Sequence, residues 1–325
     1  MGILRRGRSG PPIYTQEFLP RVPYERPDGE LPRVAALTMT RDEGAMIGHW
    51  VAHYGAQFGV ENLYVVDDHS TDGSTDALGC TVLRPPYLDK YPFERSRIGM
   101  LNSLSAALLH AYDAVVFADA DEFLVAEPRR FAGLREFIAT TADRDVIGAL
   151  GFNVVQHVEN EGPLSFDRPL LQQRRYAKFM PLMCKPMLKW APVPWVRASH
   201  GVQTPFRVDP DLFMFHFKFA DRDQLATRAT LRKQLHDDEG RAEGSSWSRD
   251  ADTMGELFDQ ISVDIVNARA DGADDASGRF RPAQDRIDQI IQPRDGAWKA
   301  VGPGQFSGMR SQPVVRIPDR FVRTV

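Results

Sequence analysis

The stretch AVVFADADEF (114–123) joins an apolar run directly to a group of acids. Its first five residues are apolar, which is typical of a short strand buried on both faces of a sheet. Asp119 and Asp121 follow at once, two positions apart. Two carboxylates so placed can both reach one divalent cation, and their hard oxygens favour Mn²⁺ or Mg²⁺. Many isolated acid pairs do no more than end a strand, so the position of this pair in the fold decides its meaning.

Short apolar runs alternate with helical three-four spacing over the first part of the chain. The predicted strands cover 34–39, 62–68, 81–83 and 114–118, and the predicted helices cover 45–58 and 96–111. Strands and helices that alternate in this way form parallel sheets with right-handed crossovers. We therefore predict an α/β fold with a mostly parallel, Rossmann-like sheet flanked by helices. Since ligands collect at the carboxyl ends of such strands, the polar residues that follow them form one candidate site.

The rest of the chain gives a weaker pattern. Further strands are predicted within 145–155 and at 212–219, helices at 222–235, 250–262 and 283–292, and a charged loop at 237–248. The predicted organisation is an extended arm over 1–32, one α/β domain over 33–220 with halves 33–125 and 126–220, and a helical C-terminal extension over 221–325.

Composition excludes several classes of protein. The 325 residues are 42% hydrophobic and 26% charged, as in an ordinary globular chain. With 40 basic and 44 acidic residues the net charge is −4, which argues against a protein that coats nucleic acid. Cys80 and Cys184 lie far apart in sequence and are predicted to be reduced, buried thiols. No run of 18 apolar residues occurs, so we predict no transmembrane segment and a cytoplasmic location. Arg5, Arg6 and Arg8 leave room for peripheral contact with the inner face of the membrane.

Two further polar clusters follow the predicted strands at 34–39 and 62–68. In the first, Arg41 could contact a phosphate and Glu43 a base or ribose, although an acid here also suits the start of the next helix. In the second, Asp68 could accept hydrogen bonds from a base or ribose. The residues STDGST that come after it suit a turn with helix-capping side chains.

The order of these motifs resembles a known family. The segments EGAMIGHWVAHYGAQFGVENLYVVDDHSTDGST (43–75) and VVFADADEFL (115–124) look like a family 2-type glycosyltransferase of the GT-A fold. The resemblance implies a UDP- or GDP-sugar donor, Mn²⁺ or Mg²⁺ held by the DxD acids, and transfer with inversion to a hydroxyl of a glycan or small acceptor. The two halves of the domain then become a nucleotide half and an acceptor half.

The resemblance also implies roles for individual residues. Those implied for the nucleotide and its diphosphate are Thr40, Arg41, Glu43, Asp68, Arg97, Asp119 and Lys185, with Lys218 as a further cation. The implied metal ligands are Asp119, Asp121 and a histidine, either His200, favoured slightly for its loop beside a glycine, or His216. The catalytic residues are Asp121, through the metal, and Glu161, which we choose as the base for the acceptor hydroxyl over its neighbours Glu159 and Asp167.

Two questions stay open at this level. Aromatic and basic residues crowd the segment 176–206, and they suit either an acceptor groove with sugars stacked on the rings or a layer of core residues over the sheet. The predicted function is a metal-dependent glycosyltransferase, and the alternative is a nucleotide- or sugar-binding module whose site has lost catalysis. The acidic balance and the carboxylates count against binding of nucleic acid.

Overall fold

The computed structural model describes residues 29–88, 91–141, 145–239, 251–266, 287 and 289–325. The chain divides into two units, residues 1–30 and residues 31–325. Nearly all of the predicted arm over 1–32 lies outside the described residues. The account below concerns the second unit.

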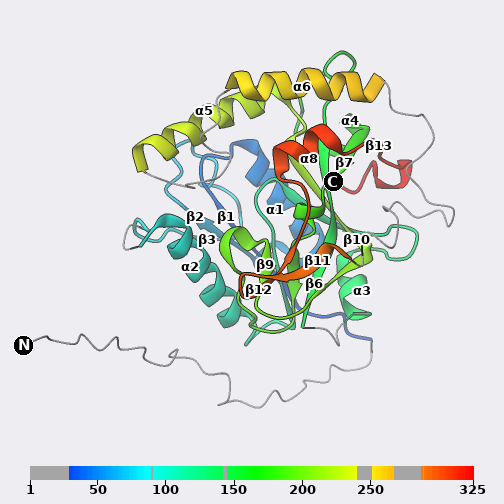
Figure 1. The fold of residues 1–325 in the computed structure, drawn as a ribbon. Coiled ribbons are helices and arrows are strands. Elements are labelled where there is room, and N and C mark those ends of the chain that lie inside the picture. Colours follow the sequence, from blue (N-terminus) through cyan, green and yellow to red (C-terminus); the bar gives the residue numbers. More distant parts are fainter. Residues whose placement is uncertain (1–28, 89–90, 142–144, 240–250, 267–286, 288) are drawn as a thin grey trace, which may run out of the picture. The chain divides into compact units, whose positions relative to one another are not determined.

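Four parallel strands form the first half of the central sheet (Figure 1). These strands are β1 (Val34–Thr40), β2 (Leu63–Asp67), β3 (Thr81–Leu83) and β4 (Ala114–Phe117), in the order β3-β2-β1-β4. Every residue of β1 and β4 is buried, which is why β4 is a continuous apolar run and β1 is interrupted only by Thr38 and Thr40 rather than alternating. The predicted strands at these positions are therefore confirmed.

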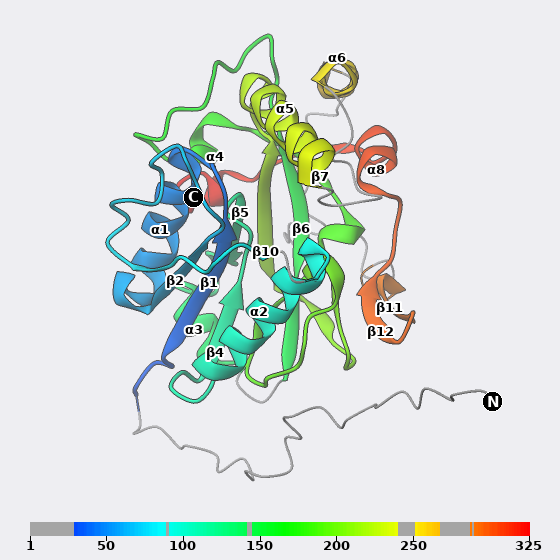
Figure 2. The ribbon, with the colours of Figure 1, turned by 90° about the vertical axis from the view of Figure 1, so that its left-hand side faces the viewer.

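Helices cover both faces of this parallel half of the sheet (Figure 2). The two apolar layers of packed side chains agree with this arrangement. Val34 and Ala36 of β1 pack in one apolar layer with α1 (Ala45–Phe58). Ala35 and Leu37 point the other way and pack in a second layer with α2 (Phe93–Leu108). Successive side chains of a strand face opposite sides of the sheet, so both layers need apolar residues.

The second half of the sheet is mixed in direction. It contains β5 (Glu122–Ala126), β6 (Val146–Val155), β7 (Tyr176–Phe179), β8 (Pro186–Lys189), β10 (Arg207–Phe219) and β13 (Val314–Arg316). β8 joins the two halves because it lies antiparallel between β4 and β6. β10 runs parallel to β6 and antiparallel to β5. The result is the α/β sheet flanked by helices that the sequence predicts, extended by antiparallel strands.

Smaller elements complete the fold. They are α3 (Leu134–Ala139), α4 (Leu170–Gln173), β9 (Gly201–Val202) and the 3₁₀ turns η2 (Val60–Asn62), η3 (Pro181–Met183), η4 (Arg197–Ser199) and η6 (Asp319–Phe321). Cys80 and Cys184 are both free, but only Cys184 is fully buried, so the prediction of two buried thiols is half right. Within the described ranges, no helix has both the length and the apolar character needed to cross a bilayer.

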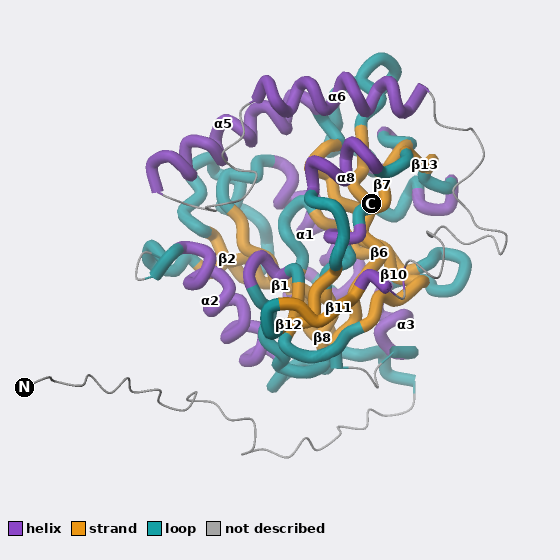
Figure 3. The backbone as a smooth tube through the Cα atoms, viewed as in Figure 1, coloured by secondary structure: helices purple, strands orange, loops and turns teal. Residues whose placement is uncertain are grey.

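The C-terminal extension contains helices and strands together (Figure 3). Its helices are α5 (Arg222–Glu239), α6 (Ala251–Val266) and α8 (Gln305–Ser311), and its strands β11 (Ile291–Arg294) and β12 (Ala297–Ala300) form a hairpin. The predicted helix over 283–292 is wrong at its end, where β11 begins, and most of its other residues lie outside the described ranges. Asp295 and Gly296 have φ of 53° and 75°, as a tight hairpin turn requires. Three residues of the predicted loop at 237–248 continue α5, and the rest is not described.

Candidate functional site at the carboxyl ends of the parallel strands

The three polar clusters of the sequence meet at one edge of the sheet. Thr40, the last residue of β1, pairs with Asp67, the last residue of β2. The Asp68 amide donates to the Thr40 carbonyl at 2.9 Å, so the two chain ends stay side by side as they leave the sheet. Asp119 follows β4, which pairs with the other edge of β1. We call this edge, with the loops 40–44, 68–75 and 118–122, the acid rim.

Asp42 joins the first two loops of the acid rim. Its Oδ1 accepts from the amides of Thr71, at 2.6 Å, and Asp72, at 3.2 Å, and its own amide donates to Ser70 Oγ at 3.1 Å. In the opposite direction, Asp72 Oδ2 accepts a hydrogen bond from the Gly44 amide at 3.0 Å. These hydrogen bonds run between loops, and α1 itself starts without a side-chain cap. The acids here therefore fix the loops to each other.

Two residues of the acid rim have a strained backbone. Among the described residues, non-glycine residues with positive φ are Asp42, His69, Ala198, Ser199 and Asp295. The first two lie in the rim loops, and Ala198 donates from its amide to Glu94, the partner of Arg97. Asp295 belongs to the hairpin of the C-terminal extension. Strained residues of this kind cost about 1–3 kcal/mol each and cluster where geometry serves function.

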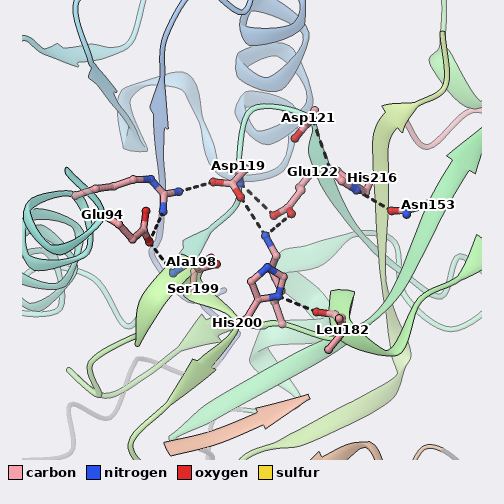
Figure 4. A network of polar contacts seen from close by, with 12 residues as sticks. Glu94, Asp119, Asp121, Glu122, Asn153, Leu182, Ala198, Ser199, His200 and His216 are labelled. Atoms are coloured by element: carbon pink, nitrogen blue, oxygen red, sulfur yellow. Dashed lines mark hydrogen bonds and ion pairs between the residues drawn. The ribbon is translucent and has the colours of Figure 1, made fainter. Parts of the chain in front are cut away.

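Asp119, the first acid of the pair, is held by two cations (Figure 4). Its Oδ1 accepts from Arg97 at 2.8 Å and its Oδ2 from Lys185 Nζ at 3.0 Å. Lys185 also donates to Glu122 Oε1 at 2.5 Å. Burial opposes the charge of Lys185, but Asp119 and Glu122 outweigh burial and raise its pKa, so this buried ammonium stays protonated. Burial also opposes the charge of Asp119 and by itself would raise its pKa, but Lys185 and Arg97 outweigh burial and lower this pKa.

Asp121, the second acid, faces a histidine. Its Oδ2 lies 3.5 Å from His216 Nε2, and the side chain is only 7% exposed. His216 Nδ1 lies 2.7 Å from Asn153 Oδ1, and since that oxygen can only accept, Nδ1 carries the hydrogen. Asn153 is fully buried and donates from Nδ2 to Met309 Sδ at 3.1 Å, which fixes the direction of its amide. The other ring nitrogen, Nε2, faces the Asp121 carboxylate, and either a proton on Nε2 or a metal cation between the two atoms can satisfy this contact.

These two side chains fit a divalent cation. A carboxylate oxygen and an imidazole nitrogen are both accepted ligands, and the hydrogen bond from the far ring nitrogen to Asn153 is the arrangement that metal-binding histidines adopt. Within the described residues no group of three or more His, Cys, Asp or Glu side chains comes together as a metal site. Asp121 and His216 would therefore supply two ligands, and water or substrate oxygens the others.

His200 occupies a different place from His216 (Figure 4). Its Nδ1 donates to the Leu182 carbonyl at 2.8 Å. Burial, helped by the nearby charge of Lys185, lowers the pKa of His200 to about 3, so the ring is neutral. The sequence favours His200 slightly as a metal ligand, but in the structure it is His216 whose Nε2 faces Asp121, the second acid of the pair.

Two arginines of α5 reach the acid rim from the C-terminal extension. Arg228 lies 3.0 Å from Glu43 Oε2 and 3.7 Å from Asp121 Oδ2, and Arg232 lies 3.6 Å from Glu43 Oε1. Burial dominates at Glu43 and raises its pKa in spite of both arginines. For Asp121, burial is outweighed by His216, Arg232 and Arg228, which lower its pKa far below the ordinary value. The sequence analysis missed both arginines, although their spacing of four puts them on one helix face.

The other predicted nucleotide residues lie at the same edge. Thr40 is buried, and its Oγ1 has no hydrogen-bond partner among the described residues. Arg41 Nε lies 3.8 Å from Asp42 Oδ2. Asp68 is buried directly after β2. Lys218, close to Asp121 and Arg232, has its pKa lowered to about 7 by burial first and by Arg232 second.

Glu161, the predicted base, belongs to a separate set of contacts. Its Oε2 accepts from the His157 amide at 2.8 Å and its Oε1 from the Arg175 amide at 3.0 Å. Burial raises its pKa. Both oxygens thus stabilise the turn after β6. Glu159 and Asp167 are exposed neighbours in the same loop.

The aromatic segment 176–206 belongs largely to the core. Trp195 is buried, its ring lies 5.1 Å from that of Phe117, and its Nε1 donates to the Pro186 carbonyl at 2.7 Å. Phe179 and Phe206 are buried as well, while Tyr176 and Trp190 are partly buried. Packing against the sheet therefore accounts for most of these rings.

Comparisons with known proteins give partial overlaps only. No known protein family matches the chain, and no characterised protein matches its sequence. A mannosyltransferase of Pyrobaculum calidifontis, solved with GDP-Man and Mn²⁺, is 19% identical with a TM-score of 0.26, over 45% of this chain and 41% of that chain. Glucosyl-3-phosphoglycerate synthase of Mycobacterium tuberculosis, solved with Mn²⁺, UDP-Glc and phosphoglyceric acid, is 18% identical with a TM-score of 0.26, over 39% and 50%. A cytidylyltransferase of Leptospira borgpetersenii is 11% identical with a TM-score of 0.22, over 40% and 57%. The chain thus matches between 41% and 57% of these proteins' own length, and overlaps of this size carry no argument about its activity.

Proposed function

We propose that the chain is a metal-dependent glycosyltransferase of the GT-A type that transfers a sugar from a UDP- or GDP-sugar to a hydroxyl of a glycan or small acceptor, with inversion. The observation that carries the proposal is the pair Asp121 and His216, which fits a cation at the carboxyl end of a parallel sheet. Asp119, Asp68 and the residues of the β1 loop gather at the same edge.

The residues of the acid rim divide the work of binding the donor. A Mn²⁺ or Mg²⁺ ion held by Asp121 and His216 would stabilise the negative charge that develops on the departing diphosphate. Arg228 and Arg232 bring two further positive charges to the same place, now balanced by Glu43 and Asp121. Such preset charges stabilise a transition state without having to move.

In the structure Asp119 does not have a free oxygen for the metal ion, and we assign it the role of positioning Arg97 and Lys185. Arg97 and Lys185 engage one oxygen each, and they keep this carboxylate ionised at the edge of the site. We assign contacts with the nucleoside and its phosphates to Thr40, Arg41, Glu43 and Asp68, which lie at the carboxyl ends of β1 and β2. Lys185 acts on the donor through Asp119.

The base for the acceptor hydroxyl is the remaining role. For Glu161 to fill it, one of its oxygens must leave a backbone amide that it now accepts from. Glu161→Gln separates the two roles, since a lost base lowers turnover by about a hundredfold or more. A turn residue replaced in this way lowers the melting temperature and leaves turnover nearly unchanged.

A nucleotide-binding module without catalysis is the second candidate, because both oxygens of Asp119 already accept hydrogen bonds from cations. Such a module binds the donor and turns nothing over. A GT-A enzyme binds the donor and also hydrolyses or transfers the sugar. Donor turnover with Mn²⁺ therefore distinguishes the two.

The test of the proposed function is a thermal-shift screen of UDP-, GDP- and dTDP-sugars with and without Mn²⁺. At least one nucleotide should raise the melting temperature only when Mn²⁺ is present, and Asp121→Asn should abolish that rise. Asp295→Asn is the matched control, since this acid lies in the exposed hairpin of the C-terminal extension. If no nucleotide shifts the melting temperature of the wild-type protein, the proposal fails.

A further inference from the structure

Two stacked rings lie beside the acid rim, in the loops that follow β2 and β3. The ring of His69, the residue after Asp68, lies 4.0 Å from the ring of Tyr87 between centroids, with 9° between their planes. Tyr87 is 53% exposed even though His69 covers one face of its ring. The opposite face of Tyr87 is therefore the one that a ligand can cover.

The segment that carries Tyr87 is fixed at its base. Arg84 directly follows β3 and donates from Nε to Asp67 Oδ2 at 3.1 Å. Pro85 and Pro86 come next, and proline rings restrict the backbone that leads to Tyr87. A ring presented on a stiff segment loses little conformational freedom when a ligand covers it.

His69 carries two unfavourable features at once. Its φ of 61° lies in the left-handed region, which costs a residue with a side chain about 1–2 kcal/mol. Its Nε2 is buried and has no hydrogen-bond partner among the described residues. Strain and an unsatisfied buried nitrogen in one residue are typical of positions kept for a ligand rather than for the fold.

We propose that Tyr87, backed by His69, is the platform on which the base of the nucleotide stacks. The inference rests on the proposed function, since it puts the base beside Asp68 at the end of β2 and leaves the diphosphate to the rest of the acid rim. Every base has a flat face, so a stacking platform serves uracil and guanine alike. Stacking on one aromatic side chain corresponds to an affinity gain of about tenfold or more.

Isothermal titration calorimetry in Mn²⁺ tests the platform with three ligands: UDP, GDP and pyrophosphate, which has no base. Tyr87→Ala should weaken UDP and GDP by about tenfold or more and leave pyrophosphate within about twofold. Tyr87→Phe keeps the ring and is the matched control, so its affinities should equal those of the wild-type protein.

The outcomes separate the platform from the proposed function. If Tyr87→Ala binds UDP and GDP as tightly as the wild-type protein, the platform is wrong and the proposed function stands. If Tyr87→Ala weakens the binding of pyrophosphate as much as that of the nucleotides, Tyr87 supports the whole acid rim rather than the base, and the platform is again wrong. If the wild-type protein binds none of the three ligands, the proposed function fails and the platform fails with it.

His69→Gly gives an independent readout. Glycine adopts positive φ without strain, and the substitution removes the unsatisfied nitrogen. The melting temperature should therefore stay level or rise while the affinity for UDP falls. A melting temperature several degrees lower would make the stacked pair a structural feature and overturn the proposal.

Discussion

Lys185 offers a prediction whose size follows from the burial of its partners. Its ammonium lies 2.5 Å from Glu122 Oε1 and 3.0 Å from Asp119 Oδ2. Lys185→Met removes the cation from both acids. Asp119 is 30% exposed, so water can replace its lost partner, but Glu122 is only 1% exposed and has no such replacement. Breaking one side of a buried pair costs about 3–5 kcal/mol, and most of that loss should come from Glu122.

A double-mutant cycle isolates the interaction. Glu122→Gln alone leaves Lys185 paired with Asp119 and should cost about 1–3 kcal/mol. The combined Lys185→Met and Glu122→Gln variant carries neither buried charge, so it should recover much of the stability that Lys185→Met loses. Urea unfolding followed by circular dichroism measures all four proteins. The explanation is refuted if Lys185→Met costs less than about 1 kcal/mol, or if the double variant is no more stable than Lys185→Met.

Three further predictions concern His53, Asn153 and the partner of the buried Lys178. Burial lowers the pKa of His53 from 6.5 to about 4, so its contribution to stability is intact above pH 6.5 and is lost as the pH falls towards 4, by about 3 kcal/mol. Urea unfolding at pH 7 and pH 4.5 should show a smaller loss for His53→Gln than for the wild-type protein, and an equal loss would contradict this. Asn153→Leu should weaken Mn²⁺ binding by about tenfold or more in calorimetry, because nothing then holds the hydrogen on Nδ1 of His216. Asn153→Asp keeps an acceptor there and should retain Mn²⁺ binding, so equal affinities of the two variants would count against the metal site. Asp264→Asn removes the charge 2.5 Å from the fully buried Nζ of Lys178. It should cost about 2 kcal/mol in urea unfolding, less than a fully buried pair because Asp264 is partly exposed, and no change would contradict that estimate.

The parallel half of the sheet could be predicted because strands that are buried on both faces have recognisably apolar sequences. β4 is an unbroken apolar run, β1 is interrupted only by two threonines, and helices with three-four spacing separate these strands along the sequence. Because the carboxyl ends of parallel strands lie at one edge of the sheet, the acids that follow these strands come together there for any loop conformation. For this reason the sequence alone predicts that Asp119, Asp121 and Asp68 lie at one edge of the sheet, while their roles stay a prediction.

The antiparallel half was harder to predict, for physical reasons that differ from element to element. β5 begins at Glu122, directly after the acid pair, because the Glu122 amide closes a tight turn onto the Asp119 carbonyl. The hairpin of β11 and β12 did have a signal, the Asp295-Gly296 pair, which a helical interpretation of 283–292 overlooked.

The site residues that sequence analysis missed depend on long-range contacts. Arg228 forms an ion pair with Glu43, which is far away in the sequence, and no local sequence pattern predicts such a pair. The sequence gives a weak signal for Asn153, because it is a polar residue inside the apolar run of β6 and a buried amide needs a hydrogen-bond partner. That partner, His216, stands on β10, whose pairing with β6 is itself non-local.

The most direct test of the account is anomalous scattering from crystals grown with Mn²⁺ and UDP or GDP. The account predicts a manganese peak within bonding distance of Asp121 Oδ2 and His216 Nε2, with the diphosphate on the same ion. A nucleotide bound at the acid rim with no manganese at these two atoms, or a manganese peak elsewhere on the chain, would contradict it.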